Sequence, residues 1–140
     1  MSRGLRNRNP GNIRLSTTKF KGEVEQSTDS EFKQFRGDAW GYRAMFVILN
    51  TYNVKYELNT IRQMISRWAP PIENHTSIYV DAVSRRAQLD ADTPIDTCQR
   101  VAMVPLVAAM SFVENGVAAD WASVERGWDL FEVDRLGAGS

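Results

Sequence analysis

Residues 101–116 read VAMVPLVAAMSFVENG and form the most apolar stretch of the chain. Residues 97–113 are therefore predicted to form a strongly apolar helix, which Pro105 should kink because its ring removes one backbone hydrogen bond. Glu114-Asn115-Gly116 is expected to close this helix, since glycine is the residue that most often follows a helix end. The stretch thus predicts an apolar helix that ends on an ionisable side chain, Glu114.

Two helices are predicted between residues 38 and 70 from apolar side chains at helical spacing. The first begins at Asp38, a residue type suited to the N-cap, and runs for about four turns. Its buried stripe should consist of Tyr42, Met45, Phe46, Leu49 and Tyr52. The second follows Asn59 and is stopped by Pro70-Pro71, because proline disfavours helix in the residues before it. Its inner face should hold Ile61, Met64, Ile65 and Trp68.

Two further helices are predicted in the second half of the chain. One runs from about Asn74 or His75 to the polar connector 90–96, with an inner face of Ile78, Tyr79, Ala82 and Val83. The other lies near residues 120–131 and should bury Trp121, Val124, Trp128 and Phe131. Trp40, Trp121 and Trp128 are accordingly assigned to the core.

The N-terminal third has a different pattern. Asn9-Pro10-Gly11-Asn12 is dense in turn formers, and two short extended candidates follow it, at Ile13 to Leu15 and at Phe32 to Phe35. We expect these segments to pair as a small sheet. The predicted fold class is therefore mainly α (α+β), a helical domain with a small β-hairpin, in which residues 1–136 form one domain and residues 137–140 a flexible tail.

Composition excludes several classes of protein. The 140 residues suffice for one compact domain, and hydrophobic residues at 43% give it enough apolar mass for a core. The formal net charge is zero, which disfavours a nonspecific nucleic-acid binder, and no basic recognition helix is present. Charge is nevertheless uneven, since residues 1–36 hold eight basic and four acidic side chains, whereas residues 90–140 hold three basic and nine acidic ones.

Neither a metal nor a cofactor is expected. The single cysteine, Cys98, and the single histidine, His75, exclude a cysteine- or histidine-rich metal cage, and no glycine-rich phosphate loop is present. The first residues lack the apolar core of a signal peptide, and no apolar run is long enough to cross a bilayer. We therefore expect synthesis in the cytoplasm without a signal peptide, and no membrane insertion.

Glu114 is the principal candidate for catalysis. It ends a helix whose preceding residues are almost wholly apolar, and an apolar wall favours the protonated form of a carboxyl group. A carboxylic acid kept protonated near neutral pH is what a glycosidase needs to protonate a leaving-group oxygen. The alternative is a solvent-facing Glu in the last helical turn, followed by a glycine that simply ends the helix.

Residues 108–116, AAMSFVENG, resemble the catalytic helix end of lysozyme-like lytic transglycosylases and flagellar-type glucosaminidases, whose general acid is this Glu. The turn that follows it in those enzymes is similar to residues 9–14, NPGNIR, which here lie at the opposite end of the chain. Later motifs resemble FKQF at 32–35, WAPP at 68–71 and Tyr79, in the same order. This order suggests a circularly permuted lysozyme-like domain, in which Glu114 would line a cleft with Tyr79 and the 9–14 turn.

The resemblance implies a peptidoglycan-degrading glycosidase: a muramidase, a glucosaminidase or a lytic transglycosylase. Glu114 would be the general acid, and Tyr79 would orient the substrate or stabilise developing charge. Glu73 is the best candidate for a second carboxylate, and its alternative role is that of a helix-capping acid. A transglycosylase needs no second carboxylate, because the N-acetyl group of the substrate can assist. The expected substrate-binding residues are Asn9, Asn12, Arg14, Gln34, Trp68 and Asn74.

The chain also resembles small phage-encoded proteins, often labelled only as virion or structural proteins, that share NPGNIR, RWAPP and the pattern Glu-Asn-x-Thr-x-x-Tyr. That resemblance spans most of residues 3–116 and implies an alternative, a noncatalytic component of a phage particle or a glycan binder without turnover. The expected partners are peptidoglycan strands and other virion proteins, at the cell wall or within a phage particle.

Overall fold

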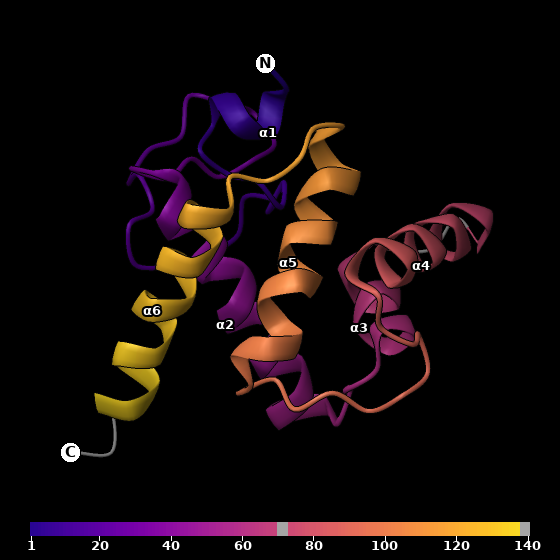
Figure 1. Ribbon diagram of the computed structural model, residues 1–140. Helices are drawn as coiled ribbons and strands as arrows, with labels where there is room; N and C mark the ends of the chain where they lie inside the picture. The colour runs from indigo at the N-terminus through magenta and orange to yellow at the C-terminus, as the bar shows by residue number, and fades with distance from the viewer. Residues whose placement is uncertain (70–72, 138–140) are drawn as a thin grey trace.

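The computed structural model describes residues 1–69 and 73–137, with the side chains of residues 73 and 74 left out. Within these residues the protein is mainly helical, as predicted (Figure 1). The prediction that Pro70-Pro71 stops a helix, and most of the predicted tail, lie outside the described residues. The helices are α1 (Arg3–Arg6), α2 (Asp38–Tyr56), α3 (Ile61–Trp68), α4 (Glu73–Ala87), α5 (Arg100–Asn115) and α6 (Trp121–Gly137).

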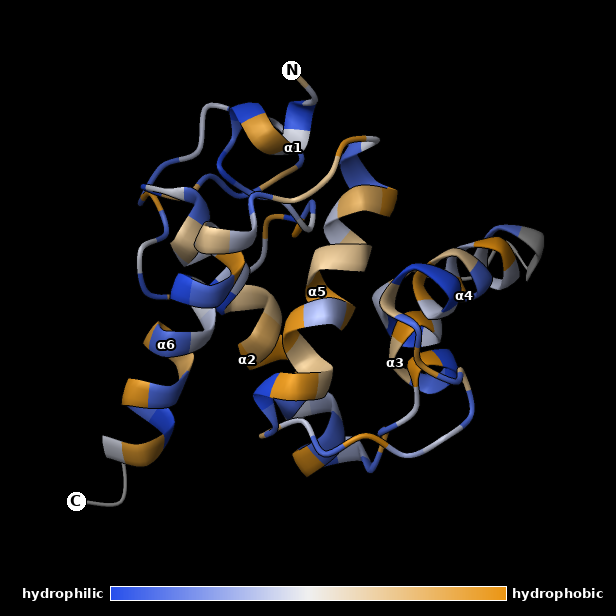
Figure 2. Cartoon of the chain, viewed as in Figure 1, coloured by the Kyte–Doolittle hydropathy of each residue, from blue (hydrophilic) through white to orange (hydrophobic). Residues whose placement is uncertain are grey.

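Helix α5 is the centre of the packing. Figure 1 shows it between α2 and α6 on one side and α3 and α4 on the other, and Figure 2 shows hydrophobic residues along much of its length. Met103, Leu106 and Met110 are almost completely buried in it, which stabilises the fold by roughly 1.5–3 kcal/mol for each side chain. The helix continues through Pro105 and ends at Gly116, whose φ of 74° is the left-handed conformation that glycine adopts readily.

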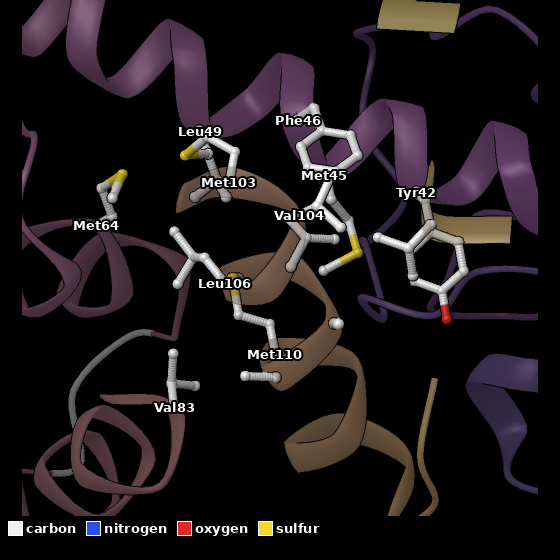
Figure 3. Packing of buried hydrophobic residues seen from close by; sticks show 14 of the residues in the cluster. Tyr42, Met45, Phe46, Leu49, Met64, Val83, Met103, Val104, Leu106 and Met110 are labelled. Carbon is white, nitrogen blue, oxygen red and sulfur yellow. The ribbon is translucent and has the colours of Figure 1, made fainter. Parts of the chain in front are cut away.

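Helix α2 packs on α5 and most extensively on α6. Figure 3 shows Met45, Phe46 and Leu49 of α2 above Met103 and Val104 of α5. The Phe46 ring meets Trp128 of α6 edge to face, with centroids 5.0 Å apart. Trp128 is buried as predicted, whereas Trp121 is 50% exposed and was wrongly assigned to the core, because it lies in the first turn of α6, ahead of the buried face that starts at Val124.

The predicted start of α2 needs a correction, whereas α3 follows Asn59 as predicted. Gly37, not Asp38, is the N-cap of α2, and Asp38 instead lies in the first turn, where a negative charge is favourable, with its carboxylate 3.4 Å from Arg8. Helix α3 is capped by Thr60, which forms a capping box with Gln63. Its inner face holds Ile61, Met64 and Ile65, as predicted.

Helix α4 buries a slightly different face from the one predicted. Tyr79, Val80 and Val83 are buried, whereas Ile78 is 66% exposed. The buried stripe begins one residue later than the sequence pattern indicated, and Val80 takes the inward position that was given to Ile78.

The N-terminal segment has no strand among its described residues, so the predicted β-hairpin is reduced to isolated bridges between Arg14 and Phe32 and between Glu23 and Phe35. The backbone of Lys33 still donates to Ile13, at 3.0 Å. Leu15 likewise donates to the carbonyl of Glu31, at 2.9 Å. Side chains add further bonds: the Asp29 carboxylate, for example, accepts the backbone N–H groups of residues 31 and 32. The short helix α1, which the sequence did not indicate, precedes this segment. None of the described helices is long and apolar enough to cross a membrane.

Candidate functional site

A cleft of about 410 Å³ opens where the N-terminal turn meets α2, α3 and the end of α5. Figure 1 shows why these parts meet: the N-terminal segment lies beside the end of α5 that leads to α6. The cleft has an aromatic side and a polar side, and Glu114 contributes to the polar side. Its lining consists of Gly11, Asn12, Ile13, Arg14, Phe32, Ile48, Tyr52, Trp68, Ala69 and Glu114.

Both carboxyl oxygens of Glu114 accept a hydrogen bond from a residue that is distant in sequence. The side-chain amide of Asn12 donates to Oε1 at 2.9 Å, and the hydroxyl of Tyr79 donates to Oε2 at 2.9 Å. Glu114 lies in the last turn of α5 and is half-buried. Its carboxyl group is therefore held in one orientation at the cleft wall, by one donor from the N-terminal turn and one from α4.

Tyr79 lies behind Glu114 and outside the cleft lining. It is 8% exposed, and burial raises its pKa well above the ordinary value, with further contributions from the charge of Glu114 and from the hydrogen bond to it. The phenol is therefore protonated near neutral pH, where its hydroxyl donates to Glu114 Oε2.

Asn12 reaches Glu114 because of an unusual backbone conformation. Its φ is 49°, in the left-handed region that asparagine tolerates better than most residues. Its Oδ1 is buried without a hydrogen-bond partner and faces Gly4, where a Cβ atom would lie only 2.7 Å away. A glycine at position 4 thus allows α1 to close over the Asn12 amide.

Asn115 was not predicted as a site residue, although it ties the same parts together. Its Nδ2 donates to the carbonyl of Pro10 at 2.8 Å and to that of Ser111 at 2.9 Å, while its Oδ1 accepts from Ser2 at 2.7 Å. The available signal in the sequence was its position between Glu114 and the helix-ending glycine.

The aromatic side of the cleft consists of Trp68, Tyr52 and Phe32. The turn packs directly on Trp68, since a Cβ on Gly11 would lie 2.8 Å from its ring. Burial raises the pKa of Tyr52, against the opposing effect of Arg67, whose guanidinium lies 5.4 Å from the ring centroid. Tyr52 and Phe32 were missed as cleft residues because their spacing indicated a buried helix stripe and a strand.

Arg14 lines the cleft beside Phe32. Its guanidinium lies 5.0 Å from the centroid of that ring and 3.6 Å from the carboxylate of Glu31. The side chain is 72% exposed, so it can change partner without a large desolvation cost.

Two predicted substrate-binding residues have structural partners instead. Asn9 is completely buried, and its amide bonds the backbone of Ile13 and Lys33, which closes the turn. Gln34 bonds Asn7 and Thr28 and is not part of the cleft lining. The predictions for Glu73 and Asn74 concern side chains outside the described residues.

The remaining predicted residues, Glu114, Tyr79, Asn12, Arg14 and Trp68, lie together. Among the described residues that line the cleft, Glu114 is the one carboxylic acid. In the described part of the chain, no group of three or more His, Cys, Asp or Glu side chains is placed to hold a metal ion. The arrangement offers a single proton donor or acceptor at the edge of a half-apolar cleft with flat aromatic faces.

Comparison with known proteins gives one informative relative. No protein-family model matches the chain. Over 118 residues the chain is 36% identical to Protein P5 of Pseudoalteromonas phage PM2, and the match covers 82% of this chain and 72% of Protein P5. Identity at this level over this share of both chains shows common descent, and the protein belongs to the family of the phage protein P5.

Proposed function

We propose that this protein is a phage-type glycosidase that cleaves peptidoglycan, with Glu114 as its general acid. One observation carries the proposal: the Glu114 carboxyl lies at the wall of a cleft, with one oxygen held by Asn12 and the other by Tyr79. A general acid must be fixed within hydrogen-bond reach of the oxygen it protonates, and a side chain held on both oxygens is fixed in this way.

The lining of the cleft fits a glycan. Aromatic rings such as those of Trp68 and Tyr52 offer flat apolar faces for the C–H surfaces of sugar rings, while Asn12 and Arg14 offer donors for hydroxyl and acyl oxygens. These features support a glycan strand as the ligand.

The single described carboxyl favours the transglycosylase form of the reaction. Glycosidases that use water or a covalent intermediate place a second carboxylate opposite the acid. Among the described residues, the Glu31 carboxylate lies 3.6 Å from Arg14 but outside the cleft lining. In the proposed reaction Glu114 gives its proton to the glycosidic oxygen as the bond to the anomeric carbon breaks and the N-acetyl carbonyl oxygen of the substrate bonds to that carbon. The C6 hydroxyl of the same sugar then displaces the carbonyl oxygen and gives its proton to the Glu114 carboxylate, which leaves a 1,6-anhydro sugar and restores the acid.

We further propose that the domain is a circularly permuted lysozyme-like domain. The supporting observation is that the NPGNIR turn lies against the ENG helix end although Asn12 and Glu114 are 102 residues apart in the chain. In a permuted chain the same two motifs would meet in space, although the turn comes first in the sequence and the Glu helix last. The family relationship to a phage protein supports a site of action at the bacterial cell wall or within a phage particle.

A noncatalytic glycan-binding or structural role is the second candidate. The same two hydrogen bonds are compatible with it, because a carboxylate with a purely structural role also has both oxygens bonded within the protein. The cleft and its aromatic side would then bind a glycan strand without breaking it.

The deciding experiment is digestion of purified peptidoglycan by the wild type, Glu114→Gln and Glu25→Gln, with mass spectrometry of the released muropeptides. Glu25 is an exposed carboxylate outside the cleft and controls for the loss of a charge. We expect release by the wild type and by Glu25→Gln, and none by Glu114→Gln. A 1,6-anhydro product identifies a transglycosylase, and a reducing end identifies a hydrolase.

Equal release by Glu114→Gln and the wild type would refute the proposed role of Glu114. If neither protein releases muropeptides, binding separates the two candidates: Trp68→Ala should weaken cosedimentation with peptidoglycan about tenfold if the cleft binds glycan, since a lost aromatic contact costs about 1.4 kcal/mol. Unchanged cosedimentation of Trp68→Ala would exclude the cleft as the glycan site.

A further inference from the structure

We propose that Asn115 is a positioning residue, which holds the N-terminal turn against α5 so that Asn12 reaches Glu114. Its effect on turnover rests on the proposed function, whereas its effect on the Asn12–Glu114 hydrogen bond does not. Asn115 does not line the cleft, so it acts through other residues.

The contacts of Asn115 connect three parts of the chain. Its Nδ2 donates to the Pro10 carbonyl at 2.8 Å and to the Ser111 carbonyl, one helical turn earlier in α5, at 2.9 Å. Its Oδ1 accepts the hydroxyl of Ser2, at 2.7 Å. The side chain thereby uses both donors and its acceptor, and it fixes the turn and the start of α1 relative to the helix that carries Glu114.

The contact between Asn115 and Pro10 lies close to the Asn12–Glu114 hydrogen bond along the chain. Pro10 lies two residues before Asn12, so a shift of the Pro10 carbonyl moves the amide that holds Glu114 Oε1. Gly4 covers both amides, because a Cβ at that position would lie 2.6 Å from Asn115 Oδ1 and 2.7 Å from Asn12 Oδ1. The two asparagine side chains therefore form one packed unit under α1, and loss of one disturbs the other.

The helical core does not depend on this unit. The completely buried side chains of α5 lie earlier in the helix, at Met103, Val107 and Met110. Asn115→Asp keeps the size and the acceptor of the side chain but removes both donors and places a negative charge beside two carbonyl oxygens. We expect the N-terminal turn to separate from α5 in this variant while the helices stay folded.

The test combines a spectroscopic and a kinetic readout on the full chain. In the wild type, NMR should show nuclear Overhauser contacts between the Asn12 side-chain amide protons and the Glu114 side chain, which Asn115→Asp should abolish. We expect kcat on peptidoglycan to fall about 100-fold, as for a misplacement of about 1 Å. KM should change less, because Tyr52 and Trp68 lie on α2 and α3 and keep their places when the turn moves. Asn53→Asp is the matched control, since the Asn53 amide donates to Thr97, outside the cleft.

Asn115→Ser adds no charge, and its shorter hydroxyl cannot reach Pro10. It should lose the Asn12–Glu114 NMR contacts and kcat in the same way, and it tests the role of Asn115 if Asn115→Asp fails to fold. Asn12–Glu114 contacts that persist in a folded Asn115 variant would overturn the proposal. A wild type without activity on peptidoglycan would refute the proposed function, and the NMR contacts would still decide the role of Asn115.

Discussion

The N-terminal segment, residues 1–36, and the helices α2, α5 and α6 are held together by different forces. The helices bury apolar side chains such as Phe46, Leu106 and Trp128. The N-terminal segment contributes mainly polar groups to the interior, among them the completely buried Lys33 and Asn9. One part of the molecule is stabilised by apolar area and shape, the other by hydrogen bonds and charge.

This difference explains where the candidate site lies. The helices provide a rigid support, which carries Glu114 and Tyr79 at fixed positions, and the polar segment provides the turn that carries Asn12 and Arg14. Sites are most accurate when their supporting residues are themselves locked by packing and by hydrogen bonds. The seam between the two regions, where residues 9–14 meet the end of α5, offers both kinds of support. It can be tested by substitutions in the helices or in the N-terminal segment.

The largest effect is expected from a cavity in the helical region. Phe46 is completely buried, and its ring contacts Trp128 and Phe131. Phe46→Ala should lower the free energy of unfolding by about 4 kcal/mol, measured by urea titration with circular dichroism, with little dependence on salt. Val54→Ala, at a 73% exposed position of the same helix, should change it by less than about 0.5 kcal/mol. Similar losses in the two variants would contradict the idea that apolar burial stabilises this region.

In the N-terminal segment, the corresponding test is Lys33→Ala. The buried Lys33 ammonium lies 3.0 Å from the Glu23 carboxylate and donates to the carbonyls of Ser16 and Thr18. Its removal leaves a buried carboxylate without its main partner, which should cost about 3 kcal/mol.

The double variant Lys33→Met with Glu23→Gln controls for this interpretation. It removes both charges at nearly constant volume, so it should recover most of the stability lost in Lys33→Ala. A double variant as unstable as Lys33→Ala would show that Lys33 acts through its loop contacts and not by compensating Glu23.

The same difference decides how much of the fold could be predicted from the sequence. Helical spacing of apolar residues located the helices, and the errors are local, such as Ile78 on α4 and the N-cap at Gly37. The N-terminal segment has no such period, because side-chain-to-backbone bonds from Asn9 and Asp29 organise it and a specific bonding pattern leaves no repeat in the sequence. Hence α1 was missed and a hairpin was expected.

For the site, motif order predicted more than periodicity did. It singled out Glu114, Tyr79 and Asn12, and the last two each donate a hydrogen bond to the Glu114 carboxyl. Tyr52 could not be assigned to the cleft, because an aromatic residue on the inner face of a helix has the same spacing whether it faces the core or a cleft. Asn115 was missed because its partners, Ser2 and Pro10, are more than one hundred residues away.

Acid should destabilise the polar region selectively, through Asp29. This carboxylate accepts from Arg3, Asn7 and two backbone N–H groups, and the bond to Arg3 is the largest cause that holds its pKa well below the ordinary value. A carboxylate with a lowered pKa in the folded state stabilises the fold fully above its unfolded pKa of about 3.9, and this contribution declines progressively as pH falls from there through the folded-state pKa.

Asp29→Asn should therefore lose less unfolding free energy than the wild type between pH 7 and pH 3, in urea titrations at each pH. Phe46→Ala should follow the pH dependence of the wild type, because it changes no charge. Parallel pH profiles for Asp29→Asn and the wild type would contradict the role of Asp29.

The smallest effect is expected at the seam itself, from Gly116→Ala. Gly116 has a φ of 74° and ends α5 directly after Glu114-Asn115, and no atom lies within 4 Å of the position that a Cβ would take. The cost is therefore conformational, about 1 kcal/mol in thermal or urea unfolding, and not steric. Gly137→Ala, where a Cβ also meets open space but φ is not positive, should be close to neutral. If Gly116→Ala were as neutral as Gly137→Ala, an alanine would fit at the end of α5 without strain. The left-handed conformation of residue 116 would then not be required to end α5 beside the N-terminal segment.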